Sequence, residues 1–286
     1  MRLDQVLVRR IREVSGISRA RVQSWIKAGL VSVGETPAAR PSIRVREGAD
    51  IHVTLPRACR LREQPQPEPV PLDVLYEDEH LMALNKPAGM VVHPSYRNTR
   101  GTLLNGVLWH LREHETARPG LVNRLDKNTS GVVLVALSPG THERIQRDAR
   151  AGQVLKQYLA IVRGLPRPRE GVITLPLRHD PVDRRRMAVA EAGIGAPSET
   201  RYRVIAEKDG CALVQCELVT GRTHQIRVHL SACGWPLVGD AVYGGDSAAR
   251  HALHACRIAF PHPVTRTPVQ IEAPVPPDFA LDRFET

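Results

Sequence analysis

The chain has 286 residues, enough for about two domains with a sizeable core, and 42% of them are apolar, which excludes a disordered protein. Its formal net charge is +10, and only five of its 40 basic residues are lysines, so arginine supplies the other 35. Arginine binds phosphate groups through paired hydrogen bonds, so this charge favours a nucleic-acid partner. An arginine-rich genome whose protein uses the charge only for solubility is the alternative.

The five cysteines never occur as Cys-x-x-Cys, so the sequence indicates neither a zinc site nor a disulfide framework. No signal-peptide pattern opens the chain, and apolar runs such as residues 132–137 are far shorter than the roughly 18 residues that suggest a membrane span. We therefore expect a soluble cytoplasmic protein with reduced thiols, no membrane contact and no obligate protein partner.

Apolar residues recur at helical spacing over residues 3–14 and again over residues 22–30, which predicts two short amphipathic helices. Ser18 is the expected N-cap of the second helix and Gly29 its stop. Residues 51–55 alternate between apolar and polar side chains, as a strand does. These elements predict a small α/β module over the first part of the chain.

Three basic side chains, Arg19, Arg21 and Lys27, lie on the polar side of the second predicted helix. Such a face is often merely solvated, but on a compact unit of a basic protein it is also a candidate RNA contact. The stretches "RLDQVL", "SRARVQSWIKAGLVSV" and "VREGADIHV" resemble the S-four-type RNA-binding module. The chain departs from that family where Val33 runs straight into Gly34.

A segment rich in proline and charge separates this module from the rest of the chain, which predicts a linker. The predicted division is a module over residues 1–58, a linker over 59–71 and a second domain over 72–286. Short strands and helices mix in the second domain. Its clearest predicted strands are residues 80–84, 131–137, 158–162 and 211–218.

Neither nucleotide loops nor metal sites are indicated by the motifs of the chain. Gly-x-Gly-x-x-Gly and Gly-Lys-Thr are both absent, so no dinucleotide or ATP site is expected. The twelve histidines, among them His224 and His229, lack a third ligand at fixed spacing. We therefore expect no cofactor and no metal.

The stretch "NRLDKNTSG", residues 123–131, places the single carboxylate of Asp126 in a basic loop before an apolar run. Asp126 could pair with Arg124 or Lys127, or be solvated. A second stretch, "TGRTHQIRVHLSACG", shows a turn and then a helix for which Thr223 is a possible N-cap. Arg222 stands at that junction, and a buried Asp126 would need such a cation to remain ionised.

These residues carry a resemblance to a known family. "VNRLDKNTSGVVLVAL" resembles the active-site motif of the RluA-type pseudouridine synthases, in which an Arg-Leu-Asp triplet is followed by Thr-Ser-Gly. The resemblance covers most of residues 75 to 263. Its further motifs are "LNKPAGMVVHPS", "LKQYLAIVRG", "RHDPVDRRRMAV", "TGRTHQIRVHL", "PLVGDAVYGG" and "LHACRIAFPHP".

The resemblance implies roles for four residues. It makes Asp126 the catalytic aspartate, Arg222 the arginine that pairs with it, Tyr158 the base-stacking tyrosine, and Arg124 the side chain that fills the space left by a flipped base. Asn123 stands where many members have histidine. Further RNA contacts are expected from basic side chains of the same motifs: Arg178, Arg184, Arg185, His224 and Arg227.

The sequence therefore predicts an RNA pseudouridine synthase with an α+β fold, a mixed and largely antiparallel sheet, and an N-terminal RNA-binding module. Large-subunit ribosomal RNA is the expected substrate and transfer RNA the alternative. A retaining glycosidase would need a second carboxylate about 5 Å from Asp126, and no such motif is present. A non-catalytic ribosome-assembly protein would explain the charge, but not Asp126, Tyr158 and Arg222 together.

Overall fold

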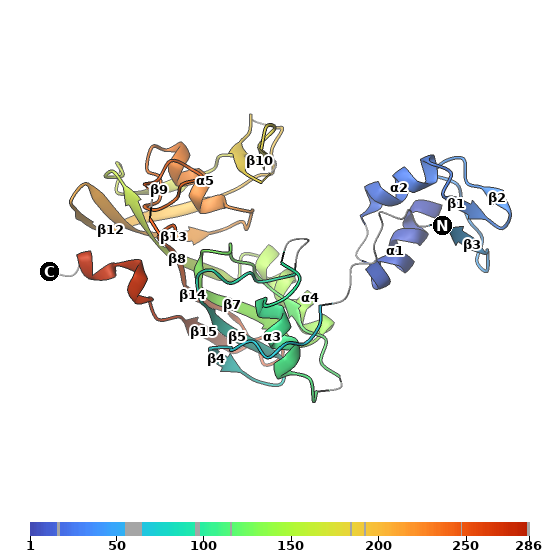
Figure 1. The fold of residues 1–286 in the computed structure, drawn as a ribbon, viewed down its shortest axis with the longest axis horizontal. Coiled ribbons are helices and arrows are strands. Elements are labelled where there is room, and N and C mark those ends of the chain that lie inside the picture. The colour runs from blue at the N-terminus through green and yellow to red at the C-terminus, as the bar shows by residue number, and fades with distance from the viewer. Residues whose placement is uncertain are drawn as a thin grey trace. The chain divides into compact units, whose positions relative to one another are not determined.

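The computed structural model describes residues 1–15, 18–54, 65–94, 98–114, 116–183, 185–191, 193–246 and 248–284. The chain divides into two compact units, Met1–Gln64 and Pro65–Thr286, whose elements are labelled in Figure 1. The first unit contains the predicted module, and the second contains the motifs that follow the proline-rich segment.

Two helices and a small antiparallel sheet make up the N-terminal unit. Its elements are α1 (Leu3–Ser15), α2 (Arg19–Lys27), β1 (Val31–Val33), β2 (Thr36–Pro37) and β3 (Ile51–Val53). The Ser18 hydroxyl caps α2 by accepting a hydrogen bond from the Arg21 amide, and Gly29 follows the helix with φ +72°. Leu3, Val22 and Ile26 are buried together, which is why the apolar spacing of the sequence predicted both helices.

The predicted linker reaches less far into the second unit than expected. Residues 55–64 lie outside the described part of the chain. The Glu68 amide donates to the Asn105 carbonyl at 3.1 Å, and the Asn105 side chain donates to the Gln66 carbonyl at 2.7 Å. Residues 66–70 are therefore bound to the second unit, and the linker cannot extend to residue 71.

Among the described residues, ten strands of the second unit form one sheet in the order β4-β5-β7-β14-β8-β13-β12-β9, with β15 on β14 and β6 on β7. Only β7 and β14 pair in parallel. This is the mixed, largely antiparallel α+β architecture that the sequence predicted. The strands are β4 (Val74–Glu77), β5 (Leu81–Lys86), β6 (Gly120–Leu121), β7 (Ser130–Ala136), β8 (Leu155–Arg163), β9 (Glu170–Ile173), β12 (Thr200–Lys208), β13 (Cys211–Leu218), β14 (Leu253–Pro261) and β15 (Pro268–Glu272).

Alternating side chains of the central strands build a core on each face of the sheet. In β5, Met82 and Leu84 point to one core while Leu81 and Ala83 point to the other. The first core also contains residues of α3 and α5, and the second contains residues of α4. The remaining elements are α3 (Leu103–His110), α4 (Pro139–Arg150), α5 (Gln225–Ala232), the hairpin β10 (Leu177–His179) and β11 (Met187–Val189), and the 3₁₀ turns η1 (Pro277–Phe279) and η2 (Leu281–Phe284).

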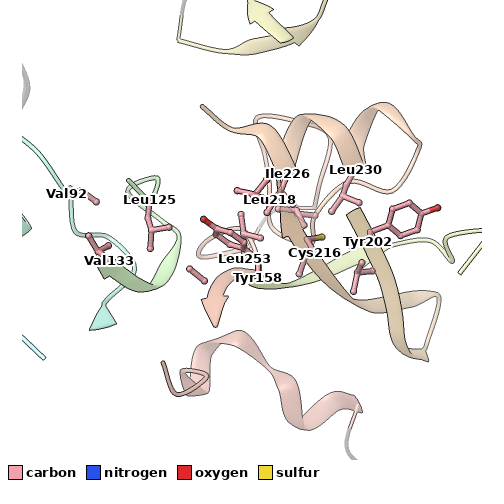
Figure 2. Packing of buried hydrophobic residues seen from close by; sticks show 14 of the residues in the cluster. Val92, Leu125, Val133, Tyr158, Tyr202, Cys216, Leu218, Ile226, Leu230 and Leu253 are labelled. Atoms are coloured by element: carbon pink, nitrogen blue, oxygen red, sulfur yellow. The ribbon is translucent and has the colours of Figure 1, made fainter. Parts of the chain in front are cut away.

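The face covered by α5 carries the residues of greatest chemical interest. Figure 2 shows Ile226 and Leu230 of α5 above the strands, and Tyr158 of β8 beside Leu253 with its hydroxyl turned toward the loop of Leu125. This packing places the loop before β7 next to the start of α5, although about a hundred residues separate them in sequence.

Candidate active site

Asp126 lies on a short loop between β6 and β7, and hydrogen bonds before and after Asp126 fix the conformation of this loop. Its carbonyl accepts a hydrogen bond from the Thr129 amide at 3.1 Å, which closes a turn. The Asn123 amide group donates to the Val132 carbonyl at 3.0 Å and accepts from the Leu134 amide at 2.7 Å. Asparagine at the usual histidine position thus ties the loop to β7, while the Asp126 side chain stays 23% exposed.

Arg227, on the first turn of α5, is the arginine that binds Asp126. Its Nη1 donates to Asp126 Oδ2 at 2.8 Å, and its Nε and Nη2 donate to Asp240 Oδ2 and Oδ1 at 2.7 and 2.9 Å. Burial opposes the guanidinium charge, but the hydrogen bonds and charges of the two aspartates outweigh it and raise the pKa of Arg227. One buried cation therefore serves two carboxylates.

The prediction that Arg222 pairs with Asp126 is wrong. Arg222 is exposed, and its Nε donates to the Pro197 carbonyl at 3.3 Å. The predicted N-cap is also different, because His224 precedes α5 with φ +55° and the Gln225 side chain accepts from the Arg222 amide at 3.0 Å. Arg222 thus binds a backbone carbonyl at the surface, and the helix that follows presents Arg227 to Asp126 instead.

His224 lies beside the same carboxylate, with Nε2 3.7 Å from Asp126 Oδ2. Its other ring nitrogen, Nδ1, lies 2.8 Å from the Tyr243 hydroxyl. Burial lowers the pKa of His224, although the charge of Asp126 acts in the opposite direction. The sequence predicted His224 as an RNA contact, and the structure places it at the edge of the Asp126 site.

Tyr158 extends from β8 into the same region and is almost fully buried, paired across the sheet with Cys216. Burial raises the pKa of its phenol, and the nearby negative charge of Asp126 raises it further. The hydroxyl therefore remains protonated at neutral pH. This environment is the opposite of the lowered pKa that a phenolate base would need.

Lys86, at the end of β5, is a site residue that the sequence interpretation missed. Its ammonium is fully buried and donates to the carbonyls of Pro87, Met90 and Lys127 at 2.8, 2.9 and 3.0 Å. Burial lowers the pKa of Lys86 to about 7, against the opposing effect of Asp126. A lysine at the end of an apolar strand and before Pro-Ala-Gly was the available signal, because lysine is almost never fully buried unless it is paired.

A second carboxylate, that of Asp240, lies near Asp126, although no motif of the sequence predicted one. Asp240 shares the guanidinium of Arg227, but its side chain is only 1% exposed. Both of its oxygens accept hydrogen bonds from Arg227, and Oδ1 also accepts from the Val242 amide at 3.2 Å. Asp240 is therefore enclosed, and it cannot act on a substrate as a glycosidase acid does.

The remaining predicted RNA contacts are distributed over both units. Arg124 of the Asp126 loop is exposed, as is Arg178 on β10. Arg185, just before β11, is exposed and binds Asp183 at 2.8 Å, whereas Arg184 lies outside the described residues.

In the N-terminal unit, Arg21 and Lys27 are exposed on α2. The Arg19 side chain is half exposed, and its guanidinium binds the buried Asp4 at 2.9 Å. Arg2 and Gln23 bind the same carboxylate, and together these hydrogen bonds hold the pKa of Asp4 at about 2 despite its burial. Arg19 is therefore a structural residue as well as a candidate RNA contact.

The described residues contain no group of three or more His, Cys, Asp or Glu side chains arranged to hold a metal ion. No helix within the described ranges is both long and apolar enough to cross a membrane.

Comparison with known proteins places these residues in a family. Residues 80–232 match the family model described as RNA pseudouridylate synthase. The chain is 36% identical to ribosomal large subunit pseudouridine synthase D of Zymomonas mobilis, over 98% of this chain and 92% of that protein. It is 40% identical to the protein of the same name from Neisseria meningitidis serogroup B, over 97% of this chain and 76% of that protein.

A solved structure agrees with these sequence matches. Human RNA pseudouridylate synthase domain containing 4 superposes with a TM-score of 0.60 at 25% identity, covering 74% of this chain and 92% of that one. The region that matches the family model contains β5 to α5, and so includes Asp126, Tyr158 and Arg227. The chain therefore belongs to the RNA pseudouridylate synthase family and is an RNA pseudouridine synthase.

Proposed function

We propose that this enzyme isomerises uridines of large-subunit ribosomal RNA and that Asp126 is its only reacting carboxylate. The observation that carries the second part is the geometry of Asp126, since Arg227 and His224 both approach the same carboxylate oxygen, Oδ2. Among the described residues none donates a hydrogen bond to Oδ1, so this oxygen remains for the substrate. The carboxylate is fixed and yet partly open to solvent.

The reaction breaks the bond between uracil N1 and ribose C1′ and forms a bond between C5 and C1′. The proton on C5 leaves and N1 ends protonated, so nothing is gained or lost overall. Asp126 can attack C1′ and form an ester, or remove a ribose proton and give a glycal, and in either route the carboxylate is regenerated. The site contains the group that both routes require.

Arg227 would hold the carboxylate in the orientation for reaction, in the role first assigned to Arg222. Tyr158 would support the extruded base by stacking, which contributes about 1–3 kcal/mol per base. Arg124, exposed two residues before Asp126, would enter the space that the extruded base leaves. Extrusion costs a few kcal/mol of stacking, and these two side chains would offset part of it.

The names of the two relatives support ribosomal RNA as the substrate, since both are described as acting on the large ribosomal subunit. The charge of +10 and the exposed Arg21 and Lys27 support RNA binding by the N-terminal unit, in keeping with its resemblance to an S-four-type module. Transfer RNA is the second candidate substrate.

The test compares Asp126→Asn with the wild type in single-turnover isomerisation of a ribosomal RNA fragment. Asn keeps the size of the side chain and can still accept a hydrogen bond from Arg227, so the fold and the RNA affinity should be retained. Pseudouridine formation should be abolished, because the amide is neither a nucleophile nor a base. Turnover near the wild-type rate by Asp126→Asn would remove Asp126 from the reaction.

A further inference from the structure

The loop from Pro236 to Gly245, which has the sequence "PLVGDAVYGG", follows α5 and reaches the site through the buried side chain of Asp240. The Asp240 side chain is buried, and its two oxygens make a bidentate contact with the Arg227 guanidinium. We propose that Asp240 is a positioning residue, which fixes the guanidinium plane of Arg227 so that Nη1 alone is directed at Asp126. This inference rests on Asp126 being the reacting group.

The hydrogen bonds of Arg227 divide in a way that supports this role. Asp240 accepts from Nε and Nη2 of the planar guanidinium through both of its oxygens, a geometry that restricts rotation of the guanidinium plane about the Cδ–Nε bond. Nη1 is the remaining nitrogen, and it donates to Asp126 at 2.8 Å. With one contact instead of three, a buried arginine side chain would have several orientations available.

The ring of Tyr243 restricts Arg227 from a second direction. The guanidinium carbon lies 5.0 Å from the ring centroid, within the range of a cation–π contact. The Tyr243 hydroxyl is itself fixed, because it accepts from the Met187 amide at 2.8 Å and lies 2.8 Å from His224 Nδ1. The arginine is thus held in its plane by Asp240 and covered on one side by Tyr243.

Asp240 is itself placed by the backbone of its loop. The carbonyl of Asp240 accepts from the amides of Tyr243 and Gly245 at 3.1 and 2.8 Å. A Cβ atom on Gly245 would lie 2.1 Å from the Leu237 carbonyl oxygen, and one on Gly239 2.1 Å from the Arg250 carbonyl oxygen, so both positions require glycine. The turn can close this tightly only with glycine at both positions, which accounts for these two glycines of the motif.

Asp240→Asn tests the proposal. The amide oxygen accepts one hydrogen bond from Arg227, but the amide nitrogen faces a second N–H donor, so the guanidinium should rotate. Misplacement of a catalytic group by about 1 Å lowers kcat on the order of 100-fold. We expect that loss, with the KM for the RNA fragment changed by less than about threefold, because the buried Asp240 carboxylate is not accessible to RNA.

A matched control is available in Asp148, another buried carboxylate that binds an arginine through both oxygens, Arg266 at 2.6 and 3.3 Å, on α4 and away from the site. Asp148→Asn should lower the melting temperature and leave kcat within about twofold of the wild type. If Asp240 had only a structural role, Asp240→Asn would behave like this control, with a lower melting temperature and an unchanged kcat. Loss of kcat in the folded Asp240→Asn protein separates positioning from a merely structural role.

The double variant with Arg227→Met gives a second measurement that remains decisive if Asp240→Asn alone does not fold. If Asp240 acts on catalysis only through Arg227, then kcat of Arg227→Met/Asp240→Asn should equal kcat of Arg227→Met within about threefold. The double variant should also melt at a higher temperature, because Arg227→Met alone leaves a buried carboxylate unpaired. Losses of kcat that multiply, or wild-type kcat in Asp240→Asn, would overturn the proposal.

Asp126→Asn, measured in the same assay, keeps two failures apart. Turnover by Asp126→Asn would contradict the proposed function itself. An inactive Asp126→Asn together with an unimpaired Asp240→Asn would leave the proposed function in place and contradict only the role of Asp240.

Discussion

Tyr158 and Asp126 are close enough to affect each other, and this proximity limits what the phenol can do. Burial and the carboxylate charge both raise the pKa of Tyr158. A phenol that stays protonated can donate a hydrogen bond and support a base by stacking. It can transfer the proton lost from C5 only in a concerted step, in which it donates its own proton while it accepts the one from C5.

The variant Tyr158→Phe separates stacking from proton transfer. Phe keeps the ring in its buried place, so the fold and RNA affinity should change little, with Kd within about threefold given that the stacking energy resides in the ring. Turnover should fall by at least about 100-fold if the hydroxyl transfers a proton. Single-turnover rates and RNA affinities measured side by side decide the matter, and an unimpaired rate leaves Tyr158 a stacking platform only.

The choice between Arg222 and Arg227 marks the limit of sequence interpretation at the level of single residues. Both stand in one motif, but the sequence predicts Arg222 as the partner of Asp126 and Arg227 as an RNA contact, whereas Arg227 is buried and binds Asp126. The ion pair with Asp126 bridges 101 positions of sequence, and its formation depends on the left-handed turn at His224 that begins α5. Local propensity predicts a helix here, but not which of two arginines faces a loop brought in by the sheet.

The elements themselves were largely predictable, because each has a local signal. The short apolar runs of β5 and β7 predicted both strands, and Ser18 and Gly29 predicted the ends of α2. The parallel pairing of β7 with β14 has no such signal, since it joins Ser130 to His254 across most of the catalytic unit. Long-range pairing of this kind depends on the whole core and not on any local pattern.

The C-terminal turns contact the Asp126 loop through one arginine. Arg250 Nη1 donates to the Asn128 carbonyl at 3.3 Å, while Nε and Nη2 donate to Asp278 at 2.7 and 2.8 Å. Phe279, next to Asp278, is buried against Ile161. The end of the chain is thereby linked to the loop that carries Asp126.

Asp278→Asn should therefore weaken both stability and catalysis to a small degree. Asp278 is well exposed, so its ion pair contributes about 1 kcal/mol or less. A freer Arg250 should lower kcat by up to about tenfold, since tenfold corresponds to about 1.4 kcal/mol. Glu272→Gln, an exposed carboxylate 3.9 Å from Arg257, is the matched control and should have no effect on kcat. Equal kcat values for the two variants would contradict the link.

The N-terminal unit offers a contrast between two arginines of one helix. Arg21→Gln should weaken RNA binding and reduce the slope of log affinity against log salt by roughly 0.7 to 0.9, as for one lost phosphate contact. Arg19→Gln should also lower the stability of the module, because it removes a partner of the buried Asp4. Titrations at several salt concentrations and melting curves distinguish them, and an unchanged slope in Arg21→Gln would exclude a phosphate contact.

On the scale of the whole molecule, several buried histidines make stability depend on pH. Burial lowers the pKa of His224, His229 and His254, and that of His251 to about 4. As pH falls below about 6.5, the unfolded chain takes up protons that these folded histidines do not. Their contribution is complete above pH 6.5 and is lost as the pH falls toward the folded values.

His251→Gln should therefore flatten the pH dependence of unfolding between pH 6.5 and 5. One histidine contributes a slope of up to about 1.4 kcal/mol per pH unit in this window, and the variant lacks it. Gln can still bond to the Thr129 hydroxyl, which lies 2.8 Å from His251 Nε2 in the wild type. Denaturant unfolding at each pH measures the slope, and identical slopes for the two proteins would mean that His251 takes up its proton equally in both states.

The central claim is that the chain modifies ribosomal RNA through Asp126, and mapping pseudouridines in cells tests it most directly. Chemically labelled pseudouridines would be sequenced in cells that lack the protein and in the same cells supplied with wild-type or Asp126→Asn protein. Specific positions of large-subunit ribosomal RNA should lose the label, regain it with the wild type and stay unlabelled with Asp126→Asn. Unchanged ribosomal RNA with losses only in transfer RNA, or recovery with Asp126→Asn, would contradict the account.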